Sequence, residues 1–162
     1  MGTTTGTQQL ESHTSSPREQ AHFCSRCGAQ PIGRRRSDRP SLERVCGVCG
    51  MGIMLGCPRE AAPSQGAAFL VVTDDLRVTA VSEGAEIFFG PELERLGSTL
   101  LSILSSAGLG VEVARAANGA RHAALLTARV AAPDGGPQLR ARVSSCGPPR
   151  AALILLTLPA DQ

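Results

Sequence analysis

The hydrophobic pattern divides the chain into a polar front and an apolar back half. Residues 1–21 are rich in Thr, Ser, Gln and Gly and hold few apolar side chains, so we expect a disordered tail. From residue 67 onward, short apolar runs alternate with turn-forming residues, which is typical of a folded domain. The pattern therefore predicts a domain over residues 67–159, preceded by a linker over residues 58–66 that holds turn formers and no periodicity.

Five apolar runs in the back half predict strands. Residues 69–72 and 77–81 flank the turn sequence Thr73-Asp74-Asp75 and predict a hairpin. Residues 122–132 and 138–144 carry apolar side chains at alternate positions on either side of a Pro-Asp-Gly-Gly-Pro loop. Residues 151–158 have almost no polar face, which indicates a central strand buried on both sides.

Helices are predicted between the hairpin and the last three strands. Ser82 can cap a short helix that ends at Gly90-Pro91. From Pro91 to Leu104, apolar positions recur every three or four residues and predict a second helix. A third helix is expected over residues 111–117, before the turn pair Asn118-Gly119.

This order of elements, and several residues within it, resemble the PAS family. The segment FLVVTDDLRVTAVSEGAEIFFG is similar to the opening hairpin of that family and the helix of type N-x-A-A-E-x-x-x-G that follows, with Ser82 in place of the usual Asn. The matching positions are Ala85, Glu86, Phe89, Gly90 and Gly97. The resemblance implies an α+β fold, namely a five-stranded antiparallel sheet with short helices on one face, which encloses an apolar cavity and is used for sensing small molecules or pairing with other domains.

In such a fold, a ligand cavity would be lined by Phe88, Phe89, Leu101 and Leu104, although apolar residues at this spacing also suit a plain core. A flavin photoreceptor of the family needs a reactive cysteine in the stretch that here reads VEVARAANGARH, and none is present. A haem-binding version needs a proximal histidine on the same helix, whereas His122 falls at the start of a predicted strand. We therefore expect neither flavin nor haem.

Four cysteines carry the strongest chemical signal in the front half. They spell C-x2-C, eighteen residues, then C-x2-C, and they are Cys24, Cys27, Cys46 and Cys49. This spacing is typical of a tetrahedral zinc site, in which four thiolates leave no open position and the metal is structural. Gly28 and Gly50, directly after each pair, can adopt the positive φ that turns backbone N–H groups toward the sulfurs. Disulfide pairing, a chance spacing, an iron site and a redox dithiol are the alternatives.

The cysteine spacing resembles the zinc-ribbon family, which implies a small platform for protein or nucleic-acid contacts over residues 22–57. The positive charge of the chain is concentrated in this segment, whose arginines include Arg34, Arg35, Arg36 and Arg39, with Arg26 and Arg44 nearby. These side chains are candidates for contacts with a partner or with nucleic-acid phosphates, although such a run also suits a solvated loop. Cys57 and Cys146 fall outside the four-cysteine pattern and are interpreted as free thiols.

The sequence shows no enzyme motif. It lacks G-x-S-x-G, a phosphate-binding glycine loop and H-E-x-x-H, and its three histidines are scattered. The first twenty residues hold no apolar segment for a signal peptide, so we expect a cytoplasmic protein without membrane contact.

The sequence thus favours a non-enzymatic regulatory or signalling protein, in which a PAS-like domain senses or pairs and a zinc ribbon docks on a partner protein. A small-molecule ligand and a homodimer formed through the PAS-like domain are left open. The alternative is a transcription-related factor that binds nucleic acid through the arginine-rich ribbon.

Overall fold

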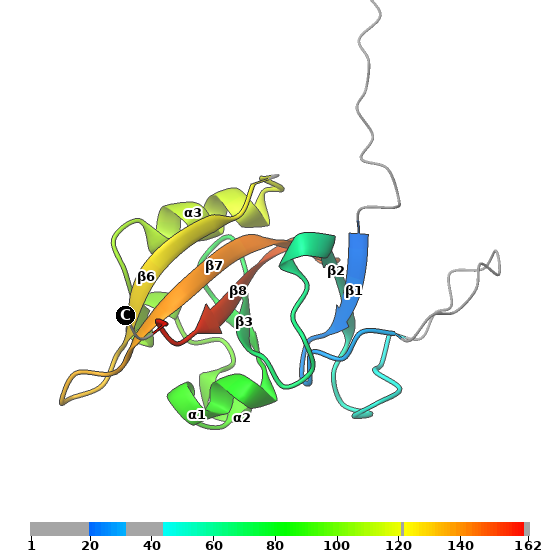
Figure 1. Ribbon diagram of the computed structural model, residues 1–162, viewed down its shortest axis with the longest axis horizontal. Coiled ribbons are helices and arrows are strands. Elements are labelled where there is room, and N and C mark those ends of the chain that lie inside the picture. Colours follow the sequence, from blue (N-terminus) through cyan, green and yellow to red (C-terminus); the bar gives the residue numbers. More distant parts are fainter. Residues whose placement is uncertain (1–19, 32–43, 121, 161–162) are drawn as a thin grey trace, which may run out of the picture.

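Two antiparallel sheets make up the fold in the computed structural model, which describes residues 20–31, 44–120 and 122–160. The smaller sheet pairs β1 (Gln20–Cys24) with β2 (Met54–Pro58). The larger sheet has six strands in the order β4-β3-β8-β7-β6-β5, and Figure 1 shows the small sheet beside it. We call residues 20–31 and 44–58 the cysteine module, and residues 67–159 the sheet module.

Strands and short helices alternate in the sheet module. The strands are β3 (Ala68–Val72), β4 (Val78–Val81), β5 (Leu104–Ser105), β6 (Ala124–Val130), β7 (Gln138–Cys146) and β8 (Ala151–Thr157). The helices are α1 (Glu86–Phe89), α2 (Glu92–Arg95) and α3 (Leu109–Ala117), with single 3-10 turns at Arg59–Ala61, Glu83–Ala85 and Leu100–Ser102. Within the described ranges no helix is long and apolar enough to span a bilayer.

The strand predictions hold, with one correction in number. The expected hairpin forms between β3 and β4, and β8 lies between β3 and β7 with most of its residues buried, as its continuous apolar sequence predicted. The sheet has six strands rather than five, because the two residues of β5 pair with Val130 and Arg129 of β6. The α+β class with an antiparallel sheet and short helices is therefore confirmed.

The predicted helix from Pro91 to Leu104 is wrong. Helix α2 ends at Arg95, since Leu96 takes an extended backbone with ψ 130° and Gly97 follows in the left-handed region with φ 77°. The chain then reverses along β4, where the N–H of Gly97 donates to the carbonyl of Val78. The apolar residues do recur at helical spacing, but the helix does not continue through them, because Gly97 adopts a positive φ and interrupts it.

Ser82 caps the first helical segment, as predicted. Its Oγ accepts from the backbone N–H of Ala85 at 3.2 Å and from that of Phe69 at 2.8 Å, and it donates to the carbonyl of Ala67 at 2.9 Å. The hydroxyl is fully buried and joins the end of the hairpin to the start of β3. The predicted third helix is α3, which begins two residues earlier than expected.

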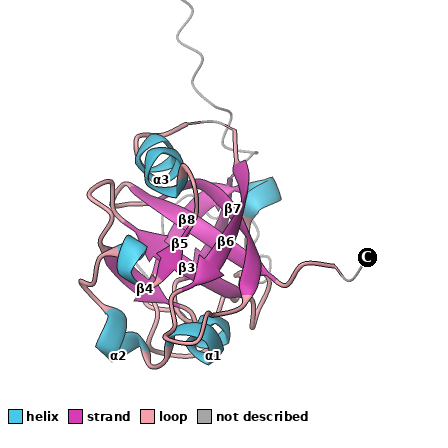
Figure 2. Ribbon diagram, turned by 90° about the vertical axis from the view of Figure 1, so that its left-hand side faces the viewer, coloured by secondary structure: helices cyan, strands magenta, loops and turns pink. Residues whose placement is uncertain are grey.

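The two faces of the large sheet are covered in different ways. Leu70 and Val72 of β3 and Ile154 of β8 belong to a core cluster that also contains residues of α1 and α3, and Figure 2 shows the helices around the strands. Phe69 of β3 and Leu153 of β8 belong to a second cluster on the opposite face, which includes residues of β1 and β2. The sheet module covers its first face itself, whereas the cysteine module covers part of the second.

Three predictions concern the N-terminal tail, the arginine-rich segment and the linker between the modules. Residues 1–19, within the predicted tail, lie outside the described residues, and so do Arg34, Arg35, Arg36 and Arg39. In the segment predicted as a linker, residues 59–61 form a 3-10 turn, and Ala61 is buried. The amide of Gln30 donates to the carbonyl of Pro63 at 3.0 Å, and the N–H of Gly66 donates to that of Cys27 at 3.0 Å, so this segment packs along the cysteine module.

Candidate metal centre and intermodule cleft

The four predicted ligands converge on one point. The Sγ atoms of Cys24, Cys27, Cys46 and Cys49 all lie within 4.8 Å of one another. The Sγ atoms of Cys24 and Cys49 are 3.6 Å apart, and those of Cys27 and Cys46 are 3.9 Å apart. Sulfurs placed about 2.3 Å from a tetrahedral zinc ion are separated by about 3.8 Å. The cluster could therefore hold a metal ion, and its dimensions are compatible with zinc.

Each cysteine pair sits in a tight turn that aims backbone N–H groups at sulfur. In the first turn, the N–H groups of Arg26 and Cys27 donate to Cys24 Sγ at 3.3 and 3.4 Å. In the second, Val48 donates to Cys46 Sγ at 3.3 Å. The turns close through the N–H groups of Gly28 and Gly50, with φ 74° and 69°, so the glycines have the conformation that the sequence suggested.

Gly52 adds a steric constraint that the sequence analysis missed. A Cβ atom at this position would lie 2.2 Å from Cys24 Sγ and 2.8 Å from the backbone nitrogen of Arg26. The N–H of Gly52 also donates to Cys49 Sγ at 3.4 Å. The chain can thus pass this close to the sulfur cluster only without a side chain, a requirement that no spacing rule could reveal.

Burial and hydrogen bonding shift the pKa values of the cluster thiols in opposite directions. Burial raises the pKa of Cys24 to about 12. The backbone N–H groups of Gly52 and Met51 lower the pKa of Cys49 to about 6. A metal cation holds its cysteine ligands as thiolates, so metal binding would release the proton that burial keeps on Cys24.

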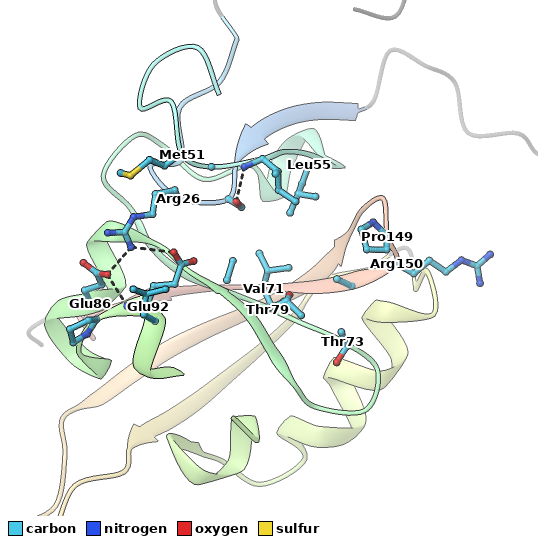
Figure 3. A pocket seen from close by; sticks show the side chains of 17 residues that line it. Arg26, Met51, Leu55, Val71, Thr73, Thr79, Glu86, Glu92, Pro149 and Arg150 are labelled. Atoms are coloured by element: carbon cyan, nitrogen blue, oxygen red, sulfur yellow. Dashed lines mark hydrogen bonds and ion pairs between the residues drawn. The ribbon is translucent and has the colours of Figure 1, made fainter. Parts of the chain in front are cut away.

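Arg26, between the first two cysteines, links the metal centre to the sheet module. Its guanidinium Nη1 lies 2.7 Å from Glu86 Oε1 and 3.7 Å from Glu92 Oε2. Figure 3 shows the three side chains at one end of a pocket. Its backbone carbonyl accepts from the N–H of Glu83 at 2.8 Å. The sequence predicts that Arg26, like the other arginines of this segment, could contact phosphates, but in the structure its side chain pairs with two glutamates of the same chain.

An aromatic contact and a backbone pairing complete the junction. The rings of Phe23 and Phe69 meet edge to face with centroids 5.5 Å apart, and both residues are fully buried. Gly56 of β2 and Gly147 exchange two backbone hydrogen bonds, at 2.6 and 2.9 Å. The cysteine module is therefore joined to the sheet by packing, by an ion pair and by a β-bridge.

Cys57 and Cys146 lie at this junction and take no part in the sulfur cluster. Both belong to the hydrophobic cluster shared by the two modules. Burial raises the pKa of Cys57 to about 11 and that of Cys146 to about 12, so both thiols stay protonated at neutral pH. Both are free thiols, as the sequence predicted, and in the protonated form they are unreactive, since the thiolate is the reactive form.

A cleft of about 620 Å³ opens between the two modules. Its walls come from the first cysteine turn, from residues 51–55 and from the α1–α2 region, and its floor is the second face of the large sheet (Figure 3). Most of its lining is apolar, and the Arg26–Glu86–Glu92 group lies at one end. Clefts of this size and lining, at the boundary of two modules, are typical ligand or partner sites.

The residues predicted to line a ligand cavity lie elsewhere. Phe89 and Leu104 are buried in the core cluster between the sheet and its helices, and Phe88 packs against it. Leu101 is 48% exposed. None of the four lines the intermodule cleft, so their role in ligand binding stays a prediction.

Comparison with solved structures finds the PAS domain of nitrogen regulation protein NR(II) from Vibrio parahaemolyticus. The two share 14% sequence identity with a TM-score of 0.49, over 58% of this chain and 90% of that one. No protein-family model matches the chain. No curated protein matches it either. The function is therefore inferred from the chain's own residues.

Proposed function

We propose that this chain is a non-enzymatic regulatory or signalling protein in which a PAS-like sheet module, used for sensing or interaction, is coupled to a structural zinc ribbon that docks on a partner. The link between the first cysteine turn and helix α1 supports this proposal most directly. Arg26 donates its backbone N–H to a cluster sulfur and its side chain to Glu86 of α1. Arg26 thus connects the turn that would hold the metal to helix α1 of the PAS-like module.

A structural role for the metal follows from the donor set. Four thiolates fill a tetrahedral shell and leave no position for a substrate or a reactive water. Cys24, Cys27 and Cys46 are also buried, and Cys49 is partly buried. The ion would fix the two turns relative to each other, and with them the surface that the cysteine module presents.

Metal analysis of the full chain purified under reducing conditions tests the proposal. We expect one zinc per chain, and an absorption spectrum without haem or flavin bands. Replacement by Co²⁺ should give the visible bands of a tetrahedral thiolate site. A preparation with no stoichiometric metal, or one that holds iron, would exclude the structural zinc site.

Nucleic-acid binding by the arginines of residues 34–39 is the second candidate, which rests on the sequence alone. Titration with duplex DNA at two salt concentrations separates it from protein docking. A complex that depends on phosphate contacts must weaken steeply as salt rises. Absence of binding at low salt would remove this candidate and leave the main proposal intact.

A further inference from the structure

The rim of the intermodule cleft carries large apolar side chains that face solvent. Met51 is 73% exposed and Ile53 46% exposed on the cysteine module, and Leu93 of α2 is 87% exposed on the opposite rim. The inner lining between them is apolar as well, with Val71 of the large sheet on the floor and Leu55 of the cysteine module on the wall. Such a cluster is costly to leave in water, and exposed apolar patches of this kind mark interaction sites.

Two further exposed apolar side chains belong to segments close in sequence to residues that line the cleft. Val48, in the second cysteine turn, is 61% exposed, and Ile87 of α1 is 82% exposed. Neither residue lines the cleft. A small molecule in the cleft would leave these side chains uncovered, whereas a macromolecular segment that crosses the cleft would cover part of them.

Charge at the α1–α2 end favours a basic partner. Two carboxylates that line this end of the cleft, those of Glu86 and Glu92, face the single guanidinium group of Arg26, while Arg150 lines the cleft beside Pro149. Arg26 already serves both Glu86 and Glu92. The end of the cleft therefore has a net negative charge that an arginine or lysine of a partner would complement.

Part of the nearby sheet edge is already paired. At β4, the N–H of Val78 donates to Ser98 and its carbonyl accepts from Gly97. The N–H of Val81 donates to Glu92 Oε1 at 3.1 Å. An added strand would compete with these bonds, whereas an amphipathic helix laid in the groove would bind through its side chains and leave them intact.

We propose that the intermodule cleft docks an amphipathic helix of a partner protein, with apolar side chains against Met51, Leu55 and Leu93 and a basic side chain at Glu86 and Glu92. This inference rests on the proposed function and names the docking surface and the partner's chemistry. The surface spans both modules, so it exists as a whole only while the metal holds the cysteine module in place.

Selection from a displayed library of helical peptides, carried out on the zinc-loaded full chain, tests this proposal. Selected peptides should share apolar residues at i, i+3 or i+4 and i+7, flanked by arginine or lysine. Fluorescence anisotropy of a selected synthetic peptide should show binding about 10-fold weaker to Leu93→Ser and to Met51→Ser. Glutamate in place of the basic residue of the peptide should weaken binding to the wild type.

Leu125→Ser is the matched control, because Leu125 is 64% exposed on β6 and does not line the cleft. Equal loss of binding in this variant, selected peptides without basic residues, or no selected binder would each overturn the proposal. So would sedimentation that shows a homodimer broken by Leu93→Ser, since a second copy would then occupy the cleft. Zinc analysis of each sample separates the two proposals: zinc-loaded protein that binds no helix contradicts docking alone, whereas protein without zinc contradicts the proposed function.

Discussion

The two faces of the large sheet differ in what keeps them from water. The first face is covered by helices of the same module, through a cluster in which Leu70, Ile154 and Leu109 are fully buried. The second face is covered in part by β1 and β2, through Phe23 and Leu55. The cysteine module is too small to form a large core of its own, so under the proposed function the cover of the second face would depend on a metal bound by the four cysteines. One face of the sheet is therefore buried within its own module, whereas burial of the other face requires the folded cysteine module.

Loss of a cysteine ligand should have the largest effect and separate the two faces. Cys24→Ser should abolish stoichiometric zinc binding and unfold the cysteine module, because metal binding supplies about 10 kcal/mol or more of the folding energy of such modules. The first face should keep the sheet module folded. Metal analysis, circular dichroism and binding of an apolar dye should show lost zinc, retained sheet signal and newly exposed apolar surface.

Cys57→Ser serves as the control for this experiment. Cys57 is buried at the junction but lies outside the sulfur cluster, so this variant should keep its zinc. Loss of the whole circular dichroism signal in Cys24→Ser would contradict the idea of a self-sufficient first face. Retention of one zinc per chain in Cys24→Ser would contradict the ligand assignment.

The loss of unfolding free energy caused by truncating a core side chain should depend on the metal for one face of the sheet and not for the other. Phe69→Ala removes the partner of Phe23 and should cost about 3–5 kcal/mol of unfolding free energy in the metal-loaded protein. After chelation this cost should fall, because the cysteine module no longer covers Phe69. Ile154→Ala, on the first face, should cost about 2–5 kcal/mol with or without metal. Equal responses of the two variants in denaturant titrations would show that the faces do not differ in this way.

A methyl group at Gly52 should weaken metal binding without removing a ligand. The added Cβ would meet Cys24 Sγ at 2.2 Å, so the turn must shift away from the cluster. We expect zinc affinity about 10-fold lower in Gly52→Ala, measured by competition with a chromogenic chelator. Gly47→Ala is the matched control, since a Cβ there meets no atom within 4 Å. Similar affinities for the two variants would contradict the crowding at Gly52.

The sequence predicted the parts of this structure that local rules determine, and missed those that depend on distant contacts. Cysteine spacing predicted the sulfur cluster, the apolar run of residues 151–158 predicted the central strand, and Ser82 predicted a cap. The break at Gly97 lay within a helical pattern, where the period alone could not show it. The cleft and the ion pair of Arg26 join residues about sixty positions apart, so no local pattern contained them.

Removal of the Arg26 side-chain charge should have the smallest effect and test how the two modules are joined. Both partners are partly exposed to solvent, so Arg26→Gln should lower stability by only about 1 kcal/mol at neutral pH. The hydrogen bond from Arg26, followed by that from the N–H of Glu92, lowers the pKa of Glu86. A carboxyl group with a lowered folded-state pKa stabilises the fold above its unfolded pKa of about 4.3, and this contribution is lost as pH falls through the folded pKa. The wild type should therefore lose more stability than Arg26→Gln on acidification through this range, as measured by denaturant titration at each pH. Arg115→Gln is the control for this experiment, because it removes an exposed pair with Glu112 on α3, and it should follow the wild-type pH profile. Parallel profiles for the wild type and Arg26→Gln would mean that the ion pair contributes nothing to the joint between the modules.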